Sequence, residues 1–238
     1  MTKETVKMKT IGLIGGMSWE STAEYYRIIN EAVKERLGGF HSAKIVMYSV
    51  DFKEIRELQL EARWDEATNL MIDAARRVER GGADFVLICT NTMHKMAEEV
   101  EASISIPLLH IADVTAERII SSGLKKVGLL GSAFTMEQDF YKGCLINKYG
   151  LEVVIPSQIK RQVVDNIIFN ELCLGEIRDS SREQIKTIMG NLVDDGAQGI
   201  ILGCTELPSL IKQKDCSVPL FDTTAIHAKA AAEYAFRN

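Results

Sequence analysis

The segment GADFVLICTNT, Gly82–Thr92, is an apolar run that ends in a cysteine, a threonine and an asparagine. A similar run, GAQGIILGCTE at Gly196–Glu206, lies 114 residues further along the chain. Both begin with Gly-Ala, continue with bulky apolar residues and end in small polar side chains. Short apolar runs of this kind, between amphipathic segments, are typical of the strands of an α/β fold. The two segments therefore predict a pair of equivalent strands, each followed by a polar turn.

Two further pairs of segments repeat in the same order. KTIGLIGG at Lys9–Gly16 matches KKVGLLGS at Lys125–Ser132 with an offset of 116 residues. IPLLH at Ile106–His110 matches VPLFD at Val218–Asp222 with an offset of 112. Three matches in sequential order, with an offset that drifts by only two residues at each step, indicate one unit present twice.

The alternation of short apolar segments with amphipathic ones is typical of an α/β fold, in which helices connect parallel strands. We expect two pseudo-symmetric parallel-sheet lobes, residues 1–112 with 208–238 and residues 113–207. Ligands of such sheets bind at the carboxyl ends of the strands, so the active site is expected in a cleft between the lobes. The expected strands are TIGLI, AKIVMYSV, DFVLIC, PLLHI, KVGLL, EVVIP, GIILGC and VPLF.

Composition excludes several classes of function. The net charge is −5 and no basic stripe stands out, which argues against a nucleic-acid partner. The apolar runs are too short to span a membrane, and the charged N-terminus MTKETVKMKT lacks the apolar core of a signal peptide. The five cysteines include no CxxC pair, which favours free thiols in a reducing cytoplasm and gives no support for a metal site. A cytoplasmic protein with a small-molecule substrate is expected.

The repeat also decides which polar residues correspond. At the offset of 114, Cys89 lies opposite Gly203 and Thr90 lies opposite Cys204. Neighbouring side chains on a strand point to opposite faces, so Cys89 is expected to be a buried apolar filler. Cys204 follows a glycine and precedes an expected helix start, where a thiol pKa would be lowered and the thiolate favoured.

The segments CTNTMH, GCTELP and GLIGGMSWEST, taken together, resemble the aspartate/glutamate racemase superfamily of amino-acid racemases, in its aspartate-racemase-like branch. The resemblance covers essentially the whole chain. It implies a pseudo-symmetric two-lobed enzyme that needs neither a metal nor pyridoxal phosphate and that is commonly a homodimer. It also implies two cysteines on opposite faces of the substrate Cα, one removing the proton and the other returning one.

This chain departs from that pattern at one position. Two-cysteine members carry the first cysteine immediately before Asn-Thr, where this chain has Thr90. A hydroxyl is a far weaker acid and base than a thiol, whose ordinary pKa is about 8.5. We therefore expect Cys204 and Thr90 to be the catalytic pair of an asymmetric racemase that acts faster on one enantiomer. The alternative is that Thr90 only binds the substrate carboxylate.

The resemblance also implies a set of residues that hold the α-carboxylate or shape the pocket. His94 is expected to pack at a helix start, and Lys160, Arg161 or Arg56 could meet a distal carboxylate. Aspartate or glutamate is the expected substrate, and a broader specificity stays open. The expected substrate-binding residues are Met17, Gln59, Asn91, Thr92, Ser132, Thr135, Thr205 and Glu206.

Two other functions stay open. A single-cysteine decarboxylase or isomerase of the same superfamily would use Cys204 to protonate an enolate. A non-catalytic amino-acid-binding protein would keep the pocket without the acid–base pair, an alternative that the missing cysteine keeps open.

Overall fold

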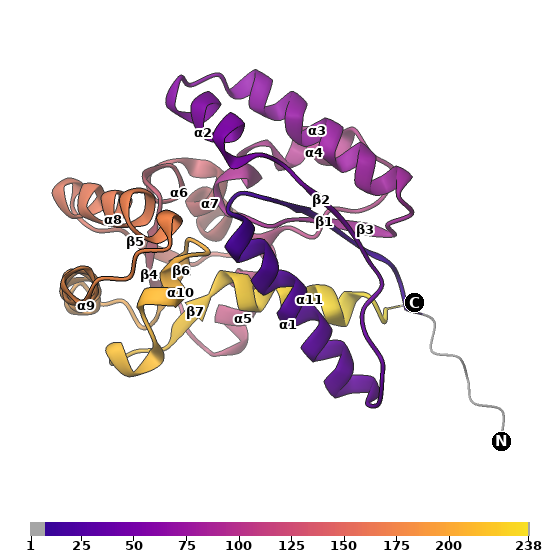
Figure 1. Ribbon diagram of the computed structural model, residues 1–238. Coiled ribbons are helices and arrows are strands. Elements are labelled where there is room, and N and C mark those ends of the chain that lie inside the picture. Colours follow the sequence, from indigo (N-terminus) through magenta and orange to yellow (C-terminus); the bar gives the residue numbers. More distant parts are fainter. Residues whose placement is uncertain (1–7, 238) are drawn as a thin grey trace. The chain divides into compact units, whose positions relative to one another are not determined.

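The computed structural model describes residues 8–237, which divide into two compact units. Unit 1 comprises residues 8–89, 96–110 and 227–237, and unit 2 comprises residues 90–95 and 111–226. Each unit holds one parallel sheet with helices around it (Figure 1). The α/β class with two parallel sheets, expected from the sequence, is confirmed.

The sheet of unit 1 has the order β2-β1-β3, and all of its pairings are parallel. A crossover helix follows each of its first two strands, as parallel pairing requires. The elements are β1 (Ile11–Gly15), α1 (Trp19–Leu37), β2 (Ile45–Ser49), α2 (Phe52–Leu60), α3 (Trp64–Arg80), β3 (Phe85–Ile88), α4 (Ala97–Ala102) and, from His227 onward, α11 (Thr223–Tyr234).

Helices cover both faces of this sheet, with α1 and α11 below it and α3 and α4 above it in Figure 1. Ile11, Leu13 and Phe85 form a fully buried core with residues of α1 and α11. Gly12 points to the other face, where an added β-carbon would collide with the side chain of Val78 on α3. Because both faces of β1 and β3 are covered, these two strands are apolar throughout, whereas the edge strand β2 exposes Met47.

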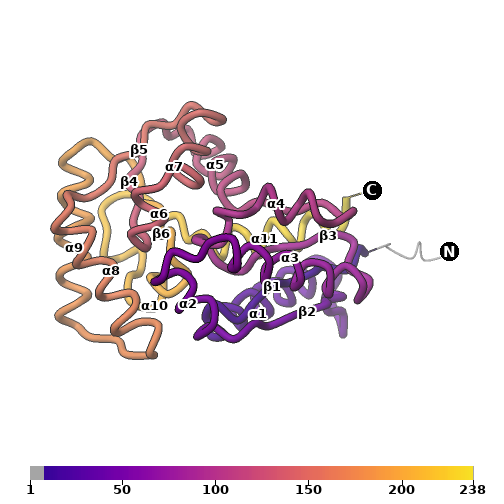
Figure 2. The backbone as a smooth tube through the Cα atoms, turned by 90° about the horizontal axis from the view of Figure 1, so that it is seen from above, coloured from indigo at the N-terminus to yellow at the C-terminus, as the bar shows by residue number. Residues whose placement is uncertain are grey.

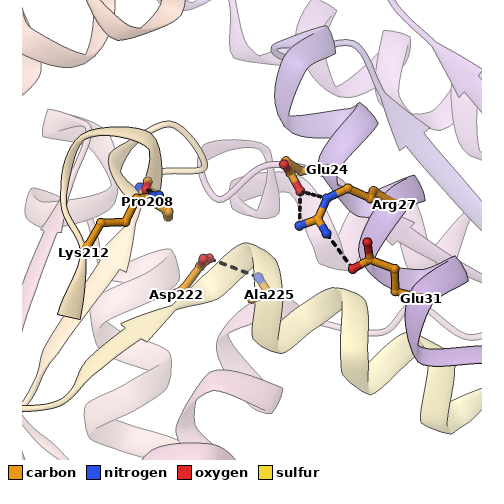
Figure 3. Close-up of polar contacts among 7 residues, drawn as sticks. All are labelled: Glu24, Arg27, Glu31, Pro208, Lys212, Asp222 and Ala225. Carbon is orange, nitrogen blue, oxygen red and sulfur yellow. Dashed lines mark hydrogen bonds and ion pairs between the residues drawn. The ribbon is translucent and has the colours of Figure 1, made fainter. Parts of the chain in front are cut away.

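Helix α1 shows how the local sequence sets an element of this unit. The Ser18 side chain caps its first turn by accepting a bond from the backbone N–H of Ser21. On its exposed face, Arg27 bonds to Glu24 and Glu31 (Figure 3). These ion pairs are accessible to water, so each contributes at most about 1 kcal/mol to stability.

The sheet of unit 2 has the order β5-β4-β6-β7 and is also parallel throughout. Helices α8 and α9 lie on one side of it, and α5 and α7 lie on the other (Figure 2). The elements are the 3-10 helix η1 (Thr92–Met96, its first four residues in this unit), α5 (Ile111–Ser121), β4 (Lys126–Gly131), α6 (Ala133–Glu137), α7 (Asp139–Gly143), the π-helix η2 (Cys144–Lys148), β5 (Glu152–Val154), α8 (Gln158–Asn170), η3 (Leu172–Leu174), α9 (Asp179–Asp194), β6 (Ile200–Gly203), α10 (Leu207–Leu210), η4 (Gln213–Asp215) and β7 (Leu220–Asp222).

The strand register confirms the internal repeat. Gly12 pairs with Val86 in unit 1, and Gly128 pairs with Ile200 in unit 2, at offsets of 116 and 114. The isolated bridge between Val86 and Leu108 corresponds to the pairing of Ile200 with β7. The alignment that places Thr90 opposite Cys204 thus rests on backbone pairing as well as on sequence.

The offset of 116 residues also relates two fully buried tyrosines, Tyr25 and Tyr141. The Tyr25 hydroxyl lies 2.9 Å from Nδ1 of His227, and Nε2 of that ring lies 2.8 Å from the Leu109 carbonyl oxygen. A carbonyl only accepts, so Nε2 carries the proton and Nδ1 accepts from Tyr25. Burial lowers the pKa of His227 to about 3. Burial also raises the pKa of Tyr141, an increase that the Thr115 hydroxyl partly offsets. In unit 1 the repeated tyrosine therefore bonds to a histidine of α11.

Two details differ from the sequence prediction. PLLHI forms a single bridge and no strand. Val86 bonds to Pro107 and Leu109, but helix α5 already begins at Ile111, so the pairing cannot continue. The predicted lobes also differ from the observed units. Residues 208–226 belong to unit 2, where β7 pairs with β6, and residues 90–95 join it as well.

Across the described range, 8–237, the helices are all too short or too polar to cross a membrane.

Candidate functional site

Cys89 and Thr90 have different surroundings although they are neighbours. The Cys89 side chain is fully buried in the core of unit 1 with Phe85 and Leu87, and burial raises the pKa of its thiol far above the ordinary value. Thr90 is half-buried and belongs to unit 2. The prediction that Cys89 is an apolar filler is confirmed.

His94 anchors the turn that begins at Thr90. Its Nδ1 lies 2.7 Å from the Thr90 carbonyl oxygen, and its Nε2 accepts from the backbone N–H of Ile111 at 3.2 Å. The carbonyl requires a proton on Nδ1 and the N–H requires a lone pair on Nε2, so the ring is neutral in this arrangement. His94 therefore joins the turn to the start of α5, in agreement with its predicted packing role.

Three of the predicted substrate-binding side chains form one hydroxyl cluster, which consists of Thr92, Ser132 and Thr135. The Thr92 Oγ1 lies 3.0 Å from Ser132 Oγ and 3.5 Å from Thr135 Oγ1, and the last two oxygens are 3.1 Å apart. All three side chains are buried. Each hydroxyl can rotate its proton, so the cluster can donate to an anion placed beside it. Its residues come from two segments that are 40 or more positions apart.

Ser132 of the hydroxyl cluster and Cys204 lie at the carboxyl ends of neighbouring strands in the sheet of unit 2. Gly131, the last residue of β4, pairs with Gly203, the last residue of β6, and the next residues are Ser132 and Cys204. A β-carbon on Gly131 would lie only 2.7 Å from the Gly203 carbonyl oxygen. The two strands therefore need glycine here, and parallel strands about 4.8 Å apart bring Ser132 and Cys204 out side by side.

Cys204 forms a thiol–carboxylate pair with Glu206. The Cys204 Sγ donates to Oε2 of Glu206 at 2.8 Å, and the Thr205 hydroxyl donates to the same oxygen at 2.9 Å. Burial, followed by the negative charge of Glu206, raises the pKa of Cys204 well above its ordinary value. The expected lowering of this pKa by a helix start is therefore wrong. Helix α10 begins three residues later, at Leu207, and the carboxylate next to the thiol disfavours a second negative charge.

Hydrogen bonds connect Asn91 to strand β6, which precedes Cys204, through Thr223, a residue that the sequence did not single out. The Asn91 Nδ2 donates to Oγ1 of Thr223 at 3.1 Å, and the Thr223 hydroxyl donates to the Leu202 carbonyl at 2.9 Å. The Asn91 Oδ1 is buried and has no hydrogen-bond partner among the described residues. Thr223 lies in FDTTAIHA without a motif of its own, and only its contacts reveal it.

The other predicted residues of the pocket, Met17 and Gln59, belong to unit 1. Met17 is buried in the turn between β1 and α1, where Gly16 adopts a positive φ of 95° and its N–H donates to Thr22. Gln59 is buried on α2, and its Oε1 lies 3.5 Å from a guanidinium nitrogen of Arg56. Their predicted contact with substrate stays a prediction, as does a cleft between the lobes.

The cations proposed for a distal carboxylate in unit 2 both have partners. Lys160 donates to the Asn191 side chain at 2.7 Å. Arg161 donates to Glu137 at 2.7 Å and to the Pro156 carbonyl at 2.8 Å. Within residues 8–237, no group of three or more His, Cys, Asp and Glu side chains could hold a metal ion.

Comparison with known proteins places these features in a family. The model of the Asp/Glu/hydantoin racemase family matches residues 14–231. The chain is 53% identical to a Yersinia pestis protein provisionally named an Asp/Glu racemase, whose crystal structure it matches with a TM-score of 0.91 over 97% of this chain and 100% of that one. An aspartate racemase homologue from Pyrococcus horikoshii is 38% identical, with a TM-score of 0.83 over 97% and 100% of the two chains.

A more distant relative has a named activity. The broad-specificity amino-acid racemase of Bacillus subtilis is 24% identical over 226 residues, which cover 92% of this chain and 95% of that protein. The similarity extends over nearly the full length of both chains.

Proposed function

This chain belongs to the Asp/Glu/hydantoin racemase family and is an amino-acid racemase, and from that premise we propose that Cys204 and Thr90 exchange the Cα proton of its substrate. The observation that carries the proposal is the close placement of two groups at the ends of β4 and β6. One is the hydroxyl cluster, which suits an α-carboxylate, and the other is the thiol–carboxylate pair, which suits proton transfer.

The hydroxyl cluster supports binding of the α-carboxylate. The hydroxyls of Thr92, Ser132 and Thr135 are buried together, and they currently bond to one another. A carboxylate that replaces these weak mutual bonds gains donors that are already in place. Removing the Cα proton moves negative charge onto the carboxylate, so donors fixed beforehand stabilise the transition state more than the ground state.

Asn91 offers a complementary group. Its buried acceptor Oδ1 has no hydrogen-bond partner among the described residues, which suits it to the α-ammonium of an amino acid rather than to the carboxylate. This proposal differs from the expectation from sequence, in which Asn91 holds the carboxylate or shapes the pocket. A neighbouring acceptor for the ammonium and several donors for the carboxylate would select an α-amino acid in one orientation.

Cys204 and Glu206 together can take a proton from the substrate Cα and give one back. Glu206 takes the thiol proton, the resulting thiolate takes the Cα proton, and the electron pair of the C–H bond remains on the substrate as a carbanion. In the reverse sense, the Cys204 thiol gives its proton to the carbanion and regains one from Glu206. The resting thiol is protonated, because burial and Glu206 raise its pKa, so it is prepared to act as the acid.

Thr90 occupies the equivalent position after β3, and we assign it the opposite face of the substrate. Its hydroxyl is too weak an acid and base to exchange the proton alone. A water molecule oriented by the hydroxyl would give its proton to the carbanion on this face and become hydroxide, and in the reverse sense that hydroxide would take the Cα proton and become water. The equilibrium constant of a racemisation is one, which forces kcat/KM to be equal in the two directions. Unequal acid–base groups must therefore make kcat and KM differ separately between the two enantiomers, and make the rate of exchange without inversion differ as well.

We propose aspartate and glutamate as the first substrates to test, with other amino acids of short side chain next. Lys160 and Arg161 are engaged by partners in unit 2, which argues against their serving as ready partners of a distal carboxylate. A broad specificity, of the kind named for the Bacillus subtilis relative, is therefore part of the proposal.

The experiment is hydrogen exchange in D₂O. Each enantiomer of aspartate and of glutamate is incubated separately with the protein, and the Cα–H signal and the optical rotation are followed together. We expect loss of the Cα–H signal with inversion of configuration for at least one of these amino acids. Binding without exchange for the whole set of amino acids would contradict the proposal and favour a non-catalytic binding protein.

One observation also favours a second candidate, a single-thiol decarboxylase or isomerase. The protonated Cys204 thiol is suited to protonating an enolate, a step that needs no base on the other face. Release of carbon dioxide from a substituted malonate, with no exchange of amino acids, would support this second candidate.

A further inference from the structure

Thr223 joins two parts of the candidate site. It is the first residue of α11 and its side chain is fully buried. The first turn of this helix is capped by Asp222, whose carboxylate accepts from the backbone N–H of Ala225 at 3.0 Å (Figure 3). Capping by Asp222 leaves the Thr223 hydroxyl available for other contacts, in contrast to the usual capping use of a threonine at a helix start.

The hydroxyl of Thr223 has one proton, and its partners decide where that proton goes. The Leu202 carbonyl, 2.9 Å away, can only accept, so the proton points to it. The Asn91 side chain, 3.1 Å away on the other side, must then present its NH₂ group as the donor. The amide orientation of Asn91 follows from this count of donors and acceptors, and Oδ1 is left as the free acceptor.

The same two bonds connect the turn after β3 with strand β6. Asn91 directly follows Thr90, and Leu202 lies two residues before Cys204. His94 holds the other side of the turn through the Thr90 carbonyl. Thr223 therefore sets both the orientation of the Asn91 amide and the position of the Thr90 turn against the strand that carries Cys204.

We propose that Thr223 is a positioning residue of the racemase reaction. It fixes the orientation of the Asn91 amide and holds the Thr90 turn against strand β6, which leads directly to Cys204. The proposal rests on the function proposed above. Thr223 itself need not touch the substrate, because its effect passes through Asn91 and through the backbone of β6.

The test compares three variants with the unmodified protein. Thr223→Val keeps the shape and removes the hydroxyl, and Thr223→Ser keeps the hydroxyl. Thr115→Val is the matched control, because Thr115 is also fully buried in unit 2 and donates to a backbone carbonyl, that of Ile111. Misplacement of a catalytic group by about 1 Å can cost about 100-fold in rate, so we expect Thr223→Val to lower kcat/KM by about 10- to 100-fold. Thr223→Ser should restore most of the rate, and Thr115→Val should leave it near the unmodified value.

A second measurement separates this proposal from the proposed function. The side-chain NH₂ resonance of Asn91 is identified by its disappearance in Asn91→Asp, and its proton exchange with water is followed by NMR. We expect slow exchange in the unmodified protein and in Thr223→Ser, and faster exchange in Thr223→Val. If no amino acid reacts, the proposed function fails, while this resonance still reports whether Thr223 holds the amide. Unchanged exchange in Thr223→Val, or unchanged kcat/KM in an active enzyme, would overturn the positioning role.

Discussion

The turn after β3 and the turn after β6 occupy the same place in the two repeats and carry different chemistry. Thr90, Asn91 and Thr92 form the first turn and contribute an amide and hydroxyls, all neutral. Cys204 and Glu206 dominate the second, with a thiol that donates to a carboxylate at 2.8 Å. The strand register places the two turns at equivalent positions.

The difference shows what duplication conserves and what it leaves free to change. Backbone pairing repeats with offsets of 116 and 114 residues, whereas the proton affinity of the side chains at the strand ends does not repeat. A racemase needs an acid and a base on opposite faces of one carbon, so unequal turns should make the two half-reactions unequal. Substitutions at the two turns test this asymmetry.

Replacing the thiol should have the largest effect. Cys204→Ser puts a hydroxyl where the reaction requires a thiol, so both turns would then lack a group of useful pKa. We expect racemisation to fall by about 1,000-fold or more, within the range seen when a nucleophile or its base is removed. Cys216→Ser is the control, since Cys216 is a partly buried thiol at the edge of the same core. Equal losses in both variants would contradict the assignment.

Removing the charge beside the thiol should separate reactivity from catalysis. Glu206→Gln removes a negative charge that raises the pKa of Cys204, so that pKa should fall and thiolate should form at a lower pH. Alkylation of Cys204 by iodoacetamide should therefore become faster at mildly alkaline pH. Racemisation should become slower, by about 100-fold, because the group that exchanges the thiol proton is lost. Alkylation and racemisation that change in the same direction would argue against this role of Glu206.

Removing one donor of the hydroxyl cluster should weaken substrate binding as well as slow turnover. Thr92→Val removes one donor and keeps the side-chain shape. Hydrogen bonds to charged groups contribute about 1.5–3 kcal/mol, so we expect KM to rise at least tenfold, with Thr92→Ser close to the unmodified enzyme. Steady-state kinetics with aspartate or glutamate would measure this change. If KM does not rise in Thr92→Val, the carboxylate binds elsewhere.

The smallest effect should come from the cysteine that is adjacent in sequence. Cys89 is fully buried in unit 1, so Cys89→Ala should lower the free energy of unfolding by about 1 kcal/mol, as expected for one buried group of this size. Its kinetics should not change. Urea unfolding and the racemisation assay together check both statements. Loss of activity in a folded Cys89→Ala protein would overturn the alignment of the two repeats.

Much of the fold could be predicted because it depends on pattern. Apolar runs, glycine-ended strands and the repeat predict two parallel sheets, the equivalence of Thr90 and Cys204, and the burial of Cys89. The hydroxyls of Thr92, Ser132 and Thr135 were also expected to serve one purpose, and the structure brings them together. The expected homodimer and cytoplasmic location stay predictions, as does a reaction without metal or pyridoxal phosphate.

Other features depend on contacts that a single sequence does not display. The raised pKa of Cys204 results from a bond to Glu206 and from burial, which outweigh the helix start that sequence suggested. Thr223 acts on Asn91 across 132 positions of the chain, and no motif marks it. The boundary between the units also depends on tertiary pairing, because β7 joins β6 although residues 208–238 were expected in the first lobe.

Position-specific deuterium incorporation tests the asymmetry of the two turns most directly. Each enantiomer of a substrate is incubated in D₂O, and deuterium is measured separately in the recovered substrate and in the product at early times. We expect that one enantiomer gains deuterium with retention faster than it inverts, that the other does not, and that Thr90→Cys removes this difference. The same ratio of retention to inversion for both enantiomers of the unmodified enzyme would contradict it.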